Sequence, residues 1–203
     1  MNRRTFVSNL AIGGTALLTA PSHASAALVC SAVSPTVEAC TAGIRSSLAN
    51  ISMSRPQQQS NWCWAACIQM VFRYNGLRIS QAKIVEEVFG ARVNQPGEPE
   101  QIVDALNRTW TDEDNDNYDV EGDIYTVSPG TAAQDLAADF PLIIGSLGHA
   151  MVLSAVSFYR DAYGNGQIVN AMVRDPWPGR GLRQITAAEW IYMSFAVRIR
   201  VTS

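Results

Sequence analysis

The chain has 203 residues, of which 47% are hydrophobic and 16% charged, and its formal net charge at pH 7 is −3. This length is sufficient for one domain with a sizeable hydrophobic core. The slightly acidic balance lacks the basic stripe that a phosphate backbone requires, so we expect no nucleic-acid partner. The sequence has no apolar run of about 20 residues, so we expect no membrane partner, and we expect a monomer.

The first residues have the three parts of an export signal in the usual order. Arg3 and Arg4 precede a mildly apolar stretch, residues 10–18, and small residues follow at 24–26. This order is typical of a twin-arginine signal. We therefore predict that residues 1–26 direct export, to the periplasm or the exterior, and are then removed. The alternative is a frayed amphipathic N-terminus.

Residues 27–56 are predicted to be an irregular N-terminal extension, because Pro35 and Pro56 interrupt them. An oxidising compartment permits disulfides, and Cys30 and Cys40 in this extension are the natural pair. The sequence leaves open whether the extension is an inhibitory segment that is removed on activation. We assign residues 57–203 to a single catalytic domain.

The first element of this domain is a predicted helix over residues 62–74, which are apolar almost all round. Such a pattern is typical of a buried helix. Ser60 or Asn61 can cap its start, and Gly76 stands past its end. Further helices are predicted over residues 80–89, 98–107 and 131–139, with Ser80 as a cap and a solvated acidic loop over 112–123.

Strand-like patterns dominate after Pro141. The predicted strands cover residues 142–147, 150–159, 167–174 and 195–201. Thr186 and Glu189 form a capping box that starts one more short helix before the last strand. Helices first and an antiparallel sheet second predict an α+β domain.

Cys63 is the candidate nucleophile because it lies in the first turn of the predicted buried helix. Unpaired backbone N–H groups at a helix start favour a thiolate, which is the reactive form of cysteine. A thiolate nucleophile also needs a base, and His149 is the one histidine outside the predicted signal. The choice of base is therefore forced.

Asp175 is the candidate partner of that base. His149 opens one predicted strand, Asp175 closes the next, and residue 162, midway between them, lies in the connecting loop. Cross-strand partners in an antiparallel hairpin are equidistant from the midpoint of the turn. The hairpin is therefore expected to bring Asp175 level with His149, where a carboxylate would fix the tautomer and orientation of the imidazole.

These residues together resemble the papain-like cysteine peptidases. The resemblance rests on Gln57, the pair Cys63 and Trp64, the run 148–150 and the run 175–177. It covers the chain from about residue 57 to the C-terminus. Residues 61–66 are especially similar to compact bacterial members, such as staphopains and plant-pathogen effector proteases. The short helical region means that the substrate cleft cannot be copied from papain.

The resemblance implies a papain-like fold and a role for each matching residue. Cys63 would form a thioester, His149 would act as base and then acid, and Asp175 would orient it where papain has asparagine. Gln57 would help to stabilise the oxyanion, although Gln58 and Gln59 are adjacent candidates. The supporting residues are Trp177, which would shield the orienting residue from water, and Trp64. Alternatively, both tryptophans are simply core residues.

Metal sites are weaker readings of the same residues. A zinc site at Cys63, Cys67 and His149 lacks a fourth ligand, and Cys67 reads more simply as a small buried hydrophobe. The acidic stretch that begins at Asp112 has Asn117 where a calcium loop needs glycine. We therefore expect no metal and no cofactor.

The sequence predicts an exported peptidase that acts on protein or peptide substrates. A second hypothesis keeps the same machinery for other amide chemistry, such as transamidation, deamidation or cleavage of cell-wall peptides, because fold and triad do not separate these reactions. A third is a non-catalytic binding module, against which the intact set Cys63, His149 and Asp175 argues.

Overall fold

The structure, a computed structural model, describes residues 27–45 and 56–203. The predicted export signal and residues 46–55 of the predicted extension lie outside the described residues. The described helices are α2 (Cys63–Tyr74), α3 (Gln81–Phe89), α4 (Pro99–Leu106), α5 (Pro129–Ala137) and α6 (Ala187–Ile191). The strands are β1 (Ala27–Ser34), β2 (Val37–Gly43), β3 (Arg108–Thr111), β4 (Asn117–Tyr125), β5 (Leu142–Ser146), β6 (His149–Asp161), β7 (Gly166–Asp175), β8 (Gly181–Gln184) and β9 (Met193–Thr202).

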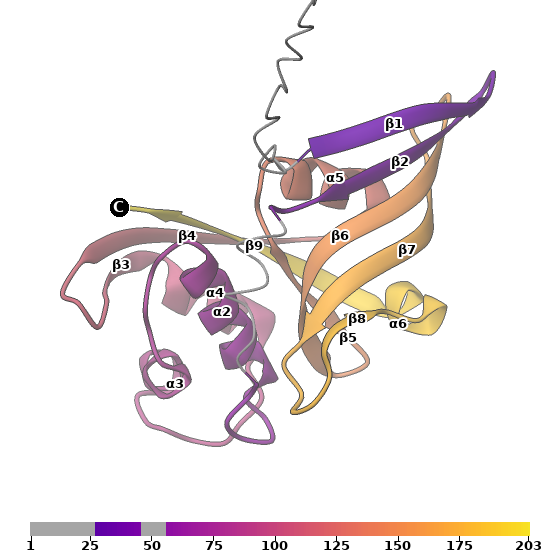
Figure 1. Ribbon diagram of the computed structural model, residues 1–203. Helices are drawn as coiled ribbons and strands as arrows, with labels where there is room; N and C mark the ends of the chain where they lie inside the picture. Colours follow the sequence, from indigo (N-terminus) through magenta and orange to yellow (C-terminus); the bar gives the residue numbers. More distant parts are fainter. Residues whose placement is uncertain (1–26, 46–55) are drawn as a thin grey trace, which may run out of the picture.

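The nine strands of the described residues form one antiparallel sheet, in which β6 pairs with β2, β5 and β7 (Figure 1). The main path runs β1-β2-β6-β5-β9-β4-β3, and β7 pairs with both β6 and β8. The first part of β6 pairs with β5 and its second part with β2, while β7 lies along its other edge. His149 is the first residue of β6, the strand that packs most extensively against α2. The α+β class is confirmed.

Helix α2 is the central helix, and it packs against β6, β5 and α3. Of its residues only Cys63 and Arg73 are not fully buried. Ile68, Met70 and Phe72 are among the largest buried side chains of the protein. In Figure 1, α2, α3 and α4 gather on one side of the sheet. The burial that the apolar sequence of this helix predicts is confirmed.

The start of α2 differs from the prediction, because neither Ser60 nor Asn61 caps it. Its N-cap residue is Trp62, which makes no side-chain capping bond. Both predicted capping side chains instead bind Asn94. The Asn94 side-chain amide donates to Ser60 Oγ at 2.9 Å, and the Asn94 backbone carbonyl accepts from Asn61 Nδ2 at 3.0 Å. The first N–H groups of α2 therefore have no capping side chain.

The other predicted helices are present with small shifts at their ends. Ser80 caps α3 by accepting a hydrogen bond from the backbone N–H of Lys83. Helix α5 begins two residues earlier than predicted because Ser128 caps it and Pro129 occupies its first turn. The capping box of Thr186 and Glu189 starts α6 as predicted.

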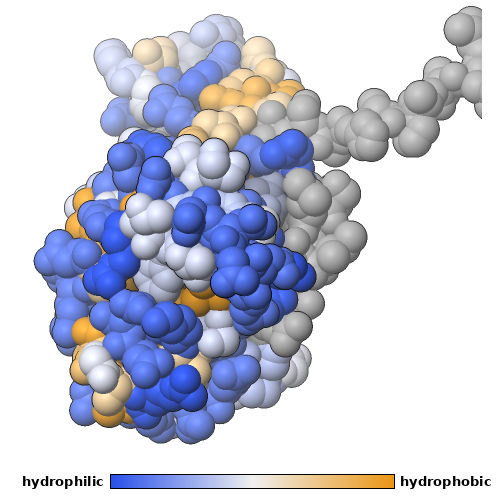
Figure 2. Space-filling model, turned by 90° about the vertical axis from the view of Figure 1, so that its left-hand side faces the viewer, coloured by the Kyte–Doolittle hydropathy of each residue, from blue (hydrophilic) through white to orange (hydrophobic). Residues whose placement is uncertain are grey.

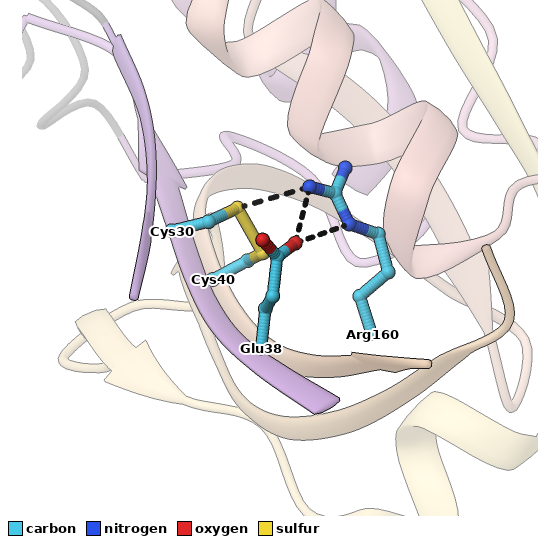
Figure 3. The surroundings of a disulfide bond; sticks show 4 residues. All are labelled: Cys30, Glu38, Cys40 and Arg160. Carbon is cyan, nitrogen blue, oxygen red and sulfur yellow. Dashed lines mark hydrogen bonds and ion pairs between the residues drawn. A yellow bond between two sulfur atoms is a disulfide. The ribbon is translucent and has the colours of Figure 1, made fainter. Parts of the chain in front are cut away.

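The prediction of an irregular extension is wrong for residues 27–43, which form the hairpin β1–β2. Ser34 pairs with Val37, so that Pro35 lies in the tight turn and does not break a strand. Strand β2 continues the sheet by pairing with β6. The predicted disulfide between Cys30 and Cys40 is present, and it joins directly opposed residues of the hairpin (Figure 3).

The prediction of an acidic loop over residues 112–123 is also wrong for most of its length, because β4 begins at Asn117 and pairs with β3 and β9. The remaining residues form a hairpin turn. The Asp112 carboxylate accepts the backbone N–H groups of Asp114 and Asp116. Asp114 also pairs with Arg78. These carboxylates thus already have protein partners.

Hydrophilic side chains cover most of the face that Figure 2 shows. The described helices include none that is both long and apolar enough to cross a membrane.

Candidate active site

Cys63 is the first residue of α2 and is only partly buried, whereas Cys67, one turn later, is fully buried. Both thiols are free. The backbone N–H groups of the first helical turn have no partner within the helix and carry its positive end. Cys63 is thus the accessible free thiol of the described residues, and it lies at the electrostatically favourable end of the helix.

The surroundings of Cys63 favour its thiolate. Burial by itself raises the pKa of the Cys63 thiol, but a hydrogen bond from His149 and the backbone N–H groups of Ala150 and Trp64 outweigh burial and lower it below the ordinary value. Burial raises the pKa of Cys67 well above the ordinary value, and the nearby charge of Cys63 adds to this rise. The pKa values of the two thiols are therefore shifted in opposite directions, down for Cys63 and up for Cys67.

His149 connects Cys63 to Asp175. Its Nε2 lies 2.7 Å from Asp175 Oδ1, so its other ring nitrogen, Nδ1, is the one left for Cys63. Burial lowers the pKa of the imidazole, but the hydrogen bonds to Cys63 and Asp175 raise it above the ordinary value. The two shifts bring the pKa values of Cys63 and His149 toward each other, in the direction that favours a thiolate paired with an imidazolium.

The predicted contact between His149 and Asp175 is present, although the strand register from which it was predicted is wrong. Strands β6 and β7 pair Val152 with Arg174, so Asp175 continues this register opposite Met151, two residues from the predicted partner. The register is the same on both sides of the two ladder irregularities, because Arg160 with Gly166 and Val152 with Arg174 share the midpoint 163, so the shift comes from a turn centred one residue later than predicted. Residues two apart on a strand share a face, so the diagonal contact to His149 survives the shift.

The Asp175 side chain is fully buried and has partners on both oxygens. Oδ1 accepts from the Trp177 backbone N–H at 2.9 Å, and Oδ2 accepts from Arg183 Nε at 2.8 Å. Burial raises the pKa of Asp175, but the bonds to His149, Trp177 and Arg183 lower it below the ordinary value. The carboxylate is thus kept ionised and fixed in orientation.

Arg183 is a site residue that the sequence reasoning missed. It lies on β8 opposite Val173, which puts its side chain diagonal to Asp175. Its terminal nitrogens bind both carboxylate oxygens of Glu189 at 3.1 and 2.5 Å. This contact with Arg183 lowers the pKa of Glu189 to about 2. The capping box indicated the position of Glu189, but β8 was not predicted, so nothing linked Arg183 to the site.

Gln57 is buried, unlike Gln58 and Gln59, which are exposed. Its Nε2 donates to the carbonyl oxygens of Gln59 and Ser60, both at 2.9 Å. Its backbone N–H donates to the Pro176 carbonyl at 2.7 Å. Gln57 therefore ties the loop before α2 to the segment that carries Asp175.

The two supporting tryptophans have different surroundings. Trp64 is buried in the core, where its indole donates to the Gln95 carbonyl at 3.1 Å. Trp177 is 46% exposed, and its ring lies edge-on to the His149 ring with centroids 6.2 Å apart. Trp177 therefore covers the imidazole from one side and is not a core residue.

Two hollows meet at Cys63 and His149. The first has a volume of about 230 Å³ and a largely apolar lining, which includes Trp64, Ile68, Ile102, Ile143, Phe195 and Val197. The second, of about 420 Å³, is more polar and extends past Trp177 toward Arg180 and Glu189. The thiol thus stands where two differently lined halves of a cleft join.

A thiol at a helix start that shares an imidazole with a buried carboxylate is the kind of arrangement on which cysteine peptidases depend. A model of the family described as papain-like cysteine protease AvrRpt2 matches residues 46–190. Because this match covers most of the chain, the protein belongs to this family and is a cysteine peptidase, a hydrolase of peptide bonds. Comparisons with curated proteins and with solved structures give no significant match.

Proposed function

We propose that this cysteine peptidase cleaves peptide bonds through a thioester on Cys63, with His149 as base and acid and Asp175 as the orienting residue. The observation that carries the proposal is that one imidazole bonds both the partly exposed thiol and the buried carboxylate. The shifts in pKa of Cys63 and His149, in opposite directions, support a thiolate–imidazolium pair as the resting state.

In the acylation step, the Cys63 thiolate attacks the carbonyl carbon of the scissile bond, and the carbonyl electrons move to oxygen. When this tetrahedral intermediate collapses, the C–N bond breaks and His149 gives its proton to the departing nitrogen. The products of the step are a thioester on Cys63, a neutral imidazole and a free amine. Transfer of this proton is necessary because an amide anion is a very poor leaving group.

In the deacylation step, the neutral His149 takes a proton from water as the water oxygen attacks the thioester. The C–S bond then breaks, and the thiolate and imidazolium are restored together with a carboxylic acid product. Asp175 keeps Nδ1 of the imidazole directed toward Cys63 in both steps and stabilises the positive charge of the imidazolium. No cofactor takes part in this scheme.

The backbone N–H of Cys63 is our candidate for one oxyanion donor, because the first N–H groups of a helix have no intrahelical partner. Gln57 is our candidate for the second. Its burial beside the loop before α2 favours it over the exposed Gln58 and Gln59. In this role its Nε2 would exchange one of its two loop carbonyl partners for the oxyanion.

The direct test of the proposal is to incubate the protein with a peptidyl inhibitor that alkylates thiolates and to locate the adduct by mass spectrometry. One adduct on Cys63, with parallel loss of proteolysis, is the expected result. Cys63→Ala should abolish labelling and proteolysis, whereas Cys67→Ala should retain both. Proteolysis that persists in Cys63→Ala would refute the proposal.

Export is the second part of the proposed function. It is supported by the twin arginine at Arg3 and Arg4 and by the disulfide between Cys30 and Cys40, because disulfides persist mainly in oxidising compartments. The substrates of a peptidase are proteins or peptides. We further propose that the protein acts as a monomer without nucleic-acid or membrane partners, in keeping with its formal net charge of −3.

A further inference from the structure

The second hollow has a lining that peptide hydrolysis alone does not explain. It is bounded by the loop before α2, by the turn at Leu147, and by the segment that runs from Trp177 to Arg183. The first hollow is lined mainly by the apolar side chains of α2, β5 and β9. A peptide that passes over Cys63 therefore meets a mainly apolar surface on one side and a more polar surface on the other.

The polar hollow lies where the departing half of the substrate is expected. His149 must hand its proton to the nitrogen that leaves, so the residues after the scissile bond lie along the flank of the imidazole. Trp177 packs edge-on against this imidazole, and Trp177 lines the second hollow and not the first. The second hollow is thus placed to receive the departing peptide.

Besides Cys63 and His149, four charged side chains line or border this hollow, and three of them are turned inward. Asp175 is fully buried, and the side chains of Arg183 and Glu189 are 21% and 16% exposed and paired with each other. Arg180 differs, because its side chain is 56% exposed. The four formal charges sum to neutrality, but the charge that faces solvent is the guanidinium of Arg180.

Arg180 retains hydrogen-bonding capacity for a ligand. Its Nη1 lies 3.4 Å from Asp175 Oδ2, an oxygen that Arg183 already holds at 2.8 Å. A guanidinium has five N–H donors, so this long contact leaves most of them available. The backbone of Arg180 is nevertheless fixed, because its N–H donates to the Trp177 carbonyl across a turn in which Gly179 has φ +84°.

We propose that Arg180 binds a carboxylate on the departing side of the substrate, so that the enzyme favours peptides with an acidic group in the first residues after the scissile bond. This inference rests on the proposed function of Cys63 and His149. A guanidinium is the side chain best suited to a carboxylate, because its N–H fork matches the two oxygens. The carboxylate is either an aspartate or glutamate side chain or the C-terminus of a short substrate.

The test begins with digestion of a proteome-derived peptide library by the full chain, with cleavage sites read by mass spectrometry. A well-cleaved sequence is then synthesised in matched pairs, with Asp or Asn after the scissile bond and with a free or amidated C-terminus. Arg180→Gln removes the charge, and Arg180→Lys keeps it. Arg78→Gln is the matched control, because Arg78 is also about half exposed, at 52%, and pairs with Asp114, and neither residue lines either hollow.

For the wild type we expect kcat/KM to favour the carboxylate-bearing peptide by about fivefold at low salt, the upper range for an exposed ion pair. Arg180→Gln should bring this ratio to about one, Arg180→Lys should keep part of it, and Arg78→Gln should keep all of it. Loss of the preference on Asp→Asn exchange assigns the carboxylate to a side chain, and loss on amidation assigns it to the C-terminus.

A wild-type enzyme that cleaves acidic and neutral partners equally, or an Arg180→Gln enzyme that keeps the preference, would overturn the inference and leave the proposed function standing. A wild-type enzyme that cleaves no peptide of the library would instead refute the proposed function, and the inference with it. Because the readout is a ratio between two substrates, a general loss of activity in a variant does not imitate the expected result.

Discussion

At the residue scale, Asp175 links His149 to the surrounding structure. One of its oxygens serves His149, and the other is held by Arg183, which in turn binds Glu189. Burial alone would raise the pKa of this carboxylate, and Arg183 offsets burial together with His149 and the Trp177 N–H, which remain when Arg183 is replaced. We therefore regard Arg183 as a positioning residue, which acts through Asp175 and does not touch the reacting atoms.

Arg183→Gln is expected to lower kcat by about 10- to 100-fold, because small displacements of a catalytic group are costly. It should also move the alkaline limb of the pH–rate profile upward. Without the guanidinium, no positive charge of Arg183 offsets the negative charge of Asp175. The pKa of the His149 imidazole then rises, and the imidazolium persists to higher pH. Arg183→Lys, which keeps the charge, should restore the limb. An unmoved limb in Arg183→Gln would show a merely structural role.

Gln57→Ala is expected to lower kcat by about 100-fold, the usual effect of removing one oxyanion donor, with little change in KM. The matched control is Gln58→Ala, because Gln58 is adjacent but exposed. It should change kcat by no more than about twofold. Steady-state kinetics measures both, and chemical denaturation separates the catalytic effect from loosening of the loop. A normal kcat with reduced stability would mean that Gln57 only holds the loop.

At the element scale, the hairpin β1–β2 is distant from the chemistry although it belongs to the same sheet. Strand β2 pairs with the second part of β6, from Ala155 to Asp161, whereas His149 opens the first part. Beside the disulfide, Arg160 binds the Glu38 carboxylate and approaches Cys30 Sγ at 3.5 Å (Figure 3). The hairpin should therefore stabilise the fold without tuning the active site.

Removal of the disulfide by the double substitution Cys30→Ala and Cys40→Ala should lower the free energy of unfolding by about 2–4 kcal/mol, as for other short loops. The kcat at 25 °C should stay unchanged. Urea denaturation without reductant measures the free energy of unfolding, and peptidase assays with a mild reductant, which keeps Cys63 as a thiol, measure kcat. A large loss of kcat in a folded double variant would show that the hairpin supports the site.

The helices were predictable because their signals are local. Ser80 and the capping box of Thr186 and Glu189 mark helix starts that the structure confirms. Strands β1, β2 and β4 were missed because their sequences are rich in small or acidic residues, and β3 because it has only four residues, so pairing within the sheet decides their conformation.

The contact between His149 and Asp175 was predictable because it requires only that both residues lie on the same face of the sheet, and not that the strand register is exact. The sequence placed Asp175 two residues from its true cross-strand position, and both positions lie on the face of His149. Arg180 and Arg183 could not be found in this way, because their place depends on β8 and on the turn that begins at Trp177. Such contacts between distant segments leave no local pattern in the sequence.

At the scale of the whole molecule, the proposed export depends on Arg3 and Arg4, which lie outside the described residues. Replacing both by lysine, which keeps the charge, should retain the full-length chain in the cytoplasm, because the twin-arginine route is read by a receptor. Cell fractionation with mass determination of the N-terminus measures this. The Arg78→Lys, Arg92→Lys double variant is the control, and normal processing of the Arg3→Lys, Arg4→Lys protein would exclude the twin-arginine route.

The central claim is that His149 keeps Cys63 as a thiolate, and the pH dependence of Cys63 alkylation tests it most directly. The rate of reaction with iodoacetamide is measured at Cys63 by mass spectrometry in the wild type and in His149→Ala. Because the pKa of Cys63 is lowered, alkylation of the wild type should persist below the range of an ordinary thiol and fall only as the pH drops through the lowered value. In His149→Ala the whole profile should move up, to about pH 8.5 or above. Identical profiles for the two proteins, both typical of an ordinary thiol, would contradict the claim.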